Sequence, residues 1–145
     1  MKQYEILEHT ADLKIKVFGQ DKKELFENAM VAMFEAAEYE AVVDSETIEQ
    51  EIKVCAHDLA SLLVNFLSEV LYLNEVNGEV YEKVEFLEFQ EDTSKLDSLR
   101  FRLSAILFGK RIKNRGVLIK GVTYHDLKIS QLKDGSWEAT ILFDI

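Results

Sequence analysis

The sequence predicts an α+β fold in one domain, residues 1–145, with two helices packed on one face of a mixed or antiparallel sheet of six or more strands. Two segments space their apolar side chains three and four residues apart, as amphipathic helices do. At least six shorter segments alternate with a period of two, as half-buried strands do. Most of these strands follow the second helix. A length of 145 residues, 48% of them hydrophobic, fits one domain, and the absence of proline excludes a proline-rich linker.

The first half of the chain contains both predicted helices. Asp21, with Glu24 three residues later, is a capping pair for the first one. Asp58 is a suitable N-cap for the second, and Asn77-Gly78 ends it because glycine readily adopts the left-handed conformation of a C′ residue. The expected order is strands at 2–8 and 13–19, a helix at 21–37, a strand at 47–55 and a helix starting at Asp58.

The second half of the chain is predicted to be all strand. A strand at 80–89 pairs naturally with one at 99–108 across the polar loop 90–98. Further strands are expected at 117–120, 123–131 and 137–143, and the turn at 133–136 joins the last two.

The charge is strongly acidic: 27 acidic and 17 basic side chains give a net charge of −10. This balance disfavours nucleic acid and anionic membranes as partners, because binding to phosphates depends on Lys and Arg. Residues 1–99 carry −15 and residues 100–145 carry +5. The basic run Lys110–Arg115 is interpreted as a solvated loop between strands, with binding to phosphate or to an acidic protein surface as the alternative.

The single cysteine, Cys55, excludes an intramolecular disulfide and a C-x-x-C zinc site. It is expected to be a small buried side chain. The N-terminal residues lack the apolar stretch of a signal peptide, and no apolar segment is long enough for a transmembrane helix. A reducing, cytoplasmic location is therefore expected.

The common catalytic motifs are absent. The chain has no phosphate-binding loop, no dinucleotide fingerprint and no nucleophile elbow. None of the three histidines, His9, His57 and His125, has the partner spacing of a zinc site, and each is more readily explained as structural.

Two aspartates are more informative. Asp12 interrupts two apolar strands, and Asp144 directly follows the apolar strand that ends at Phe143, next to the carboxylate of Ile145. Carboxylates gathered in one place repel unless a cation neutralises them, and oxygen ligands favour Ca²⁺, Mg²⁺ or Mn²⁺. The alternative is that Asp12 caps a turn and Asp144 lies in solvent.

Five short segments spread from one end of the chain to the other form a recognisable set: His9-Thr10-Ala11-Asp12, Phe18-Gly19, Leu25-Phe26-Glu27-Asn28-Ala29, Ile119-Lys120-Gly121-Val122-Thr123-Tyr124-His125 and Phe143-Asp144-Ile145. In these segments, in their order and in the helix at 58–73, the chain resembles the archease family over nearly its whole length.

The resemblance implies a role, a partner and a site. The role is that of a non-enzymatic cofactor that activates an RtcB-type RNA ligase in tRNA splicing, promoting guanylylation of the ligase histidine and multiple turnover. The site implied is a divalent-cation site, with Ca²⁺ preferred over Mg²⁺ or Mn²⁺, at Asp12, Asp144 and Ile145. Lys120, with His9 and His125 of the same motifs, is implied in activating the partner. Gly121 departs from the alanine usual in the family, which loosens the backbone beside Lys120.

Two other functions remain open from the sequence. One is a chaperone-like module for a tRNA-modifying enzyme such as a methyltransferase, which co-purification would distinguish. The other is a metal-dependent hydrolase that uses Asp12, Asp144 and His125, which turnover of model phosphoesters would reveal. The missing nucleophile motif argues against the hydrolase.

Overall fold

The computed structural model describes residues 2–7, 12–92 and 99–145 and has an α+β fold, as predicted. The described residues form two helices and eight strands. In chain order these are β1 (Tyr4–Leu7), β2 (Asp12–Gly19), α1 (Lys22–Ala36), β3 (Glu40–Ala41), β4 (Ile48–Ala56), α2 (Leu59–Asn77), β5 (Glu79–Glu91), β6 (Phe101–Asn114), β7 (Gly121–Gln131) and β8 (Trp137–Asp144). The predicted connection at 8–12 and the tip of the loop at 90–98 fall largely outside the described residues.

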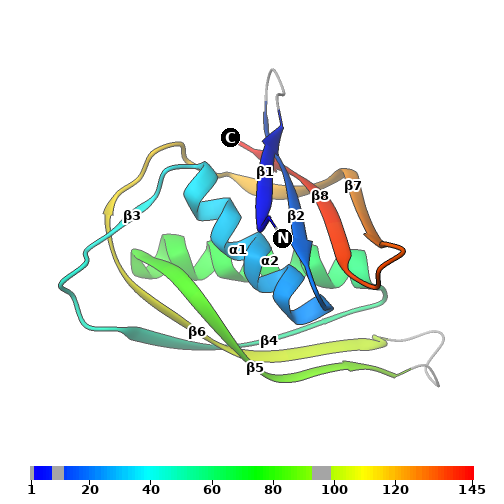
Figure 1. The fold of residues 1–145 in the computed structure, drawn as a ribbon. Helices are drawn as coiled ribbons and strands as arrows, with labels where there is room; N and C mark the ends of the chain where they lie inside the picture. The colour runs from blue at the N-terminus through cyan, green and yellow to red at the C-terminus, as the bar shows by residue number, and fades with distance from the viewer. Residues whose placement is uncertain (1, 8–11, 93–98) are drawn as a thin grey trace.

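The strands form two antiparallel sheets, which corrects the expectation of a single sheet. One sheet has the order β1-β2-β8-β7, and in the other β6 pairs with β3, β4 and β5. Each helix contacts strands of both sheets, so the helices lie between them (Figure 1). The physical reason is that α2 buries residues on several sides, so one sheet could not cover it.

The predicted caps are present at both helices. The Asp21 side chain accepts a hydrogen bond from the Glu24 amide at 2.8 Å, and Asp58 accepts one from the Ser61 amide at 2.7 Å. The hydrogen bonds from Ser61 hold the pKa of Asp58 below its usual range. Gly78 ends α2 with φ of +67°, as predicted.

Three local predictions are wrong. Residues 117–120 form no strand, because the backbone amides of Val117 and Lys120 donate to carbonyl oxygens of Ala37 and Asp144 instead of a strand ladder. The basic run from Lys110 is the end of β6, not a loop. Cys55 is exposed, because the alternation of β4 turns Ile52 and Ala56 inward and Cys55 outward.

Among the described helices, α2 alone is long and apolar enough to cross a membrane by length and composition. Its side chains Leu62, Leu63, Phe66, Leu67 and Val70 are fully or almost fully buried against the rest of the chain. A buried core helix can have the same length and apolar composition as a membrane-spanning one, and the contacts of α2 are those of a core helix.

Candidate carboxylate site at the end of a sheet

The two predicted ligands Asp12 and Asp144 come from strands that are neighbours in the sheet. β2 pairs with β8 along their whole length, and Asp12 is directly opposite Asp144. Ile15 and Phe143 are fully buried on the inner face, so alternation directs both aspartates to the outer face. The sequence separates these residues by almost the full chain, and the antiparallel register brings them together.

Lys120 reaches the same end of the sheet from the other side of β8. Gly121 is opposite Asp144 in the β7–β8 pair, and the Lys120 amide donates a 2.7 Å hydrogen bond to the Asp144 carbonyl oxygen. This bond fixes the backbone of Lys120, whose side chain is exposed. Asp144 therefore lies between Asp12 on one side and the Lys120-Gly121 segment on the other.

The arrangement suits a hard cation. Like charges placed directly opposite in a sheet repel, and a divalent ion relieves this repulsion. Asp12 is half-buried and Asp144 is exposed, so solvent has access to the pair. Throughout residues 2–7, 12–92 and 99–145, no three His, Cys, Asp or Glu side chains gather closely enough to hold a metal. A third protein ligand would have to be of another kind, and the Ile145 carboxylate follows Asp144 directly.

The two histidines of the implied motifs differ in what the structure says of them. His9 lies outside the described residues. His125 lies in an irregular part of β7, where the register with β8 shifts between Thr123 and Lys128 and Asp126 has φ of +57°. Its ring is 3.6 Å from the Asp126 carboxylate, and its amide donates to Thr123 Oγ1 at 3.0 Å. Within the described ranges, Asp12, Asp144 and His125 are not brought together as a group of three side chains that could hold a metal ion.

A hollow of about 300 Å³ adjoins Lys120, and sequence reasoning missed it. It lies between α2 and residues 118–122. Tyr72 and Leu118 line it and are 59% and 50% exposed, and Val76, one turn after Tyr72, is 62% exposed. The available signal was that Tyr72 and Val76 are apolar but fall outside the main stripe of α2. Exposed apolar side chains gathered in one place are typical of a protein-binding surface.

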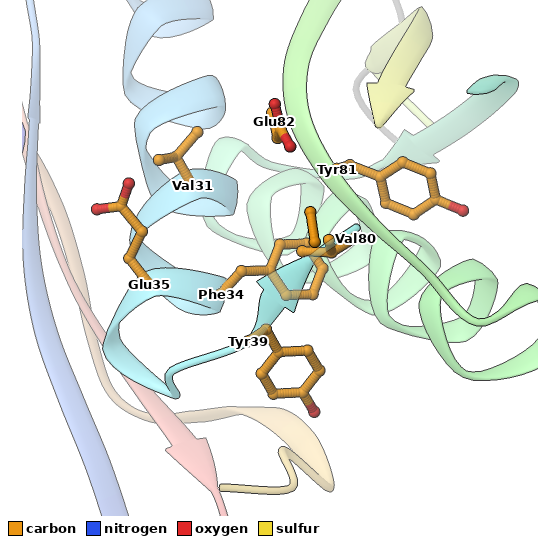
Figure 2. A pocket seen from close by; sticks show the side chains of 8 residues that line it. Val31, Phe34, Glu35, Tyr39, Val80, Tyr81 and Glu82 are labelled. Carbon is orange, nitrogen blue, oxygen red and sulfur yellow. The ribbon is translucent and has the colours of Figure 1, made fainter. Parts of the chain in front are cut away.

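A second hollow, of about 310 Å³, lies between α1, β3 and the start of β5 (Figure 2). Neither Asp12 nor Asp144 lines it. Its floor is apolar, and Glu35 and Glu82 stand at its rim. The Tyr81 ring points away from it, where its hydroxyl donates to Glu79 at 2.7 Å. Burial and this carboxylate raise the pKa of Tyr81. The contacts around Tyr81 are therefore structural.

Comparison with known proteins gives one consistent result. The Archease protein family matches residues 4–145. Protein archease of Methanosarcina barkeri is 37% identical, with 99% of this chain and 97% of the relative covered. Protein archease of Pyrococcus abyssi is 34% identical over the full length of both chains.

Solved structures agree with this match. The solution structure of Methanobacterium thermoautotrophicum protein 1598 is 29% identical, with full coverage of both chains and a TM-score of 0.76. The crystal structure of a Thermotoga maritima archease, described as a possible chaperone, covers 96% of this chain and 94% of its own, with 22% identity and a TM-score of 0.65. The latter likeness concerns the fold alone.

Proposed function

This chain belongs to the archease family, and on that premise we propose that it is an accessory protein that activates an RtcB-type RNA ligase in tRNA splicing. In this proposal it is no enzyme itself, and it promotes guanylylation of the ligase histidine and multiple turnover. The observation that carries the proposal is that Asp12 lies directly opposite Asp144. The Lys120 amide donates a hydrogen bond to the carbonyl oxygen of the same Asp144. The proposed compartment is the cytoplasm, which suits the exposed thiol of Cys55.

The proposed cation is divalent, with Ca²⁺ ahead of Mg²⁺ and Mn²⁺, because the available donors are oxygens. Asp12, Asp144 and the Ile145 carboxylate would hold it. When bound, such an ion supplies positive charge that can orient phosphate oxygens of a partner's substrate. Lys120 adds a point charge beside it, and His9 and His125, from the two implied motifs, are proposed to assist in activating the partner.

The apolar hollow beside Lys120 supports a protein as the direct partner. Tyr72 and Leu118 line it and are exposed next to the proposed site, and Val76, one turn after Tyr72, is exposed as well. The same surface also favours a second candidate function, a chaperone-like module for a tRNA-modifying enzyme such as a methyltransferase. Direct contact with nucleic acid is not part of either candidate.

The experiment is a reconstituted ligation assay at limiting ligase, with and without this protein. We expect wild type to accelerate guanylylation and turnover, and Asp144→Asn and Lys120→Gln to lose most of this stimulation. Lys133→Gln, which removes an exposed lysine in the turn before β8, is the matched control and should stimulate normally.

Two outcomes would contradict the proposal. If wild type leaves the ligase unchanged, ligase activation is wrong, and co-purification with a methyltransferase tests the second candidate. If wild type stimulates and both site variants stimulate equally well, the assigned residues are wrong although the function stands.

A further inference from the structure

A third hollow lies at the opposite end of β2 and β8 from the carboxylate pair. Gly19 pairs with Trp137 there, seven residues along the strands from the Asp12–Asp144 pair, which corresponds to roughly 23 Å at the usual rise per residue. The hollow has a volume of about 510 Å³. Asp21, Lys22, Lys23, Phe89, Gln131 and Trp137 line it. Neither the family resemblance nor the proposed function uses any of these side chains.

Aromatic and cationic groups meet in this hollow. Trp137 is half-buried, and the Lys22 ammonium lies 5.2 Å from the centre of its ring. Phe89 makes an edge-on contact with the buried ring of Phe26, with ring centres 5.1 Å apart. Lys23, the next residue of α1, also lines the hollow and is exposed.

The acidic groups at the start of α1, including Asp21, which lines the hollow, are engaged in hydrogen bonds with the backbone. The Asp21 carboxylate accepts a hydrogen bond from the Glu24 amide at 2.8 Å, and the Glu24 carboxylate accepts one from the Gln20 amide at 3.0 Å. Both carboxylates therefore stabilise the start of α1 through these hydrogen bonds. Lys22 and Lys23 provide positive charge at this point in a half of the chain that is otherwise strongly acidic.

Gln131 adds a polar group at the edge. Its Nε2 donates to the Gly135 carbonyl at 3.1 Å, which orients the amide and leaves its Oε1 as an acceptor. Gln131 is opposite Trp137 in the β7–β8 pair, so the amide lies beside the indole.

We propose that this hollow binds a nucleotide unit, with the base replacing the Lys22 ammonium on the Trp137 ring and the phosphate bound by Lys22 and Lys23. Bases stack on aromatic side chains without regard to sequence, and lysine binds phosphate as a point charge. The Gln131 amide then accepts a hydrogen bond from an amino group of the base. The volume is within the range of small-molecule sites. The nucleotide unit comes either from a free mononucleotide or from single-stranded RNA.

The chain reports on this site directly because Trp137 is its only tryptophan. The purified protein alone is titrated with GMP, guanosine, inorganic phosphate and a short single-stranded RNA while indole fluorescence is recorded. We expect saturable quenching by GMP in the millimolar range and much weaker quenching by guanosine. The Lys22→Gln/Lys23→Gln double variant should weaken GMP binding at least about tenfold, since it removes both charge-assisted contacts.

The matched control is Lys53→Gln/Lys83→Gln, which removes two exposed lysines from the other sheet and should bind GMP as wild type does. Tighter binding of RNA than of GMP assigns the site to RNA, and the reverse assigns it to free nucleotides. Absence of saturable quenching by either ligand overturns the proposal. So does equal binding by the Lys22→Gln/Lys23→Gln variant or by guanosine. The outcome is independent of ligase activation, because no ligase is present.

Discussion

Neutralising Asp144 should change the stability of the protein in opposite directions with and without a divalent cation. Asp144 is exposed and opposite Asp12, and its contact with Lys120 uses the main-chain carbonyl, which Asp144→Asn retains. The substitution therefore removes one negative charge and little else. Without a cation it relieves repulsion between the two carboxylates, and with a cation it removes a ligand.

The register sets the size of both effects. Directly opposite residues have Cβ atoms about 5 Å apart, and two unit charges at that distance in water repel by up to about 1 kcal/mol. In EDTA, Asp144→Asn should therefore raise Tm by up to about 4 °C for a domain of this size. At a Ca²⁺ concentration of about 100 times Kd, wild type gains about 2.7 kcal/mol, or roughly 10 °C, and the variant gains little.

The assay is thermal unfolding followed by circular dichroism, in EDTA and in a series of Ca²⁺ concentrations. Asp44→Asn, which neutralises an exposed aspartate between β3 and β4, is the control and should leave the Ca²⁺ response intact. An equal Ca²⁺-dependent rise in Tm for Asp144→Asn and wild type would refute the cation site. A lower Tm for the variant in EDTA would refute the argument from repulsion.

Three further predictions concern the fold. Tyr81→Phe removes a buried hydroxyl that donates to Glu79 and should cost about 1–3 kcal/mol in urea unfolding. The pKa of Tyr81 is raised in the folded state, so wild type should lose stability as the pH rises above about 10, where the unfolded tyrosine ionises. Tyr81→Phe should weaken this dependence of stability on pH. An unchanged pH dependence would contradict its assignment to Tyr81. Gly109→Ala should destabilise the protein by about 1–3 kcal/mol or more, since the added Cβ would overlap the Val80 carbonyl oxygen. If the variant unfolds at the same urea concentration as wild type, the backbone of β5 shifts to make room for the Cβ. Cys55 should react with a thiol reagent in the native protein, whereas reaction only in denaturant would mean that the thiol is buried.

Local signals in the sequence predicted both helices and most strands. The cap at Asp58 and the stop at Gly78 depend on neighbouring residues, so the sequence contains them directly. The pairing of β5 with β6 was also predictable, because one polar loop joins them. The division into two sheets was not, since β2 pairs with β8, and nothing local to β2 specifies a partner so distant in the chain.

The site shows the same limit. The alternation of β2 and β8 predicts on which face Asp12 and Asp144 lie, but only the register shows that they are opposite each other. The residue type of Cys55 favours burial, but its position in the alternation of β4 places it on the outer face. Tyr72 and Leu118 were missed because they come from separate segments that meet only in the folded chain.

The position of β8 between β2 and β7 has a consequence for synthesis of the chain. β1 and β2 are made first, yet β2 acquires its second neighbour only after residues 137–144 have left the ribosome. A nascent chain therefore holds β2 with one open edge for almost the whole of translation. Contacts of such long sequence separation also form slowly. The carboxylate pair thus exists only in a chain translated through Asp144, and a product that ends before β8 would lack both the β2–β8 pairing and the carboxylate pair.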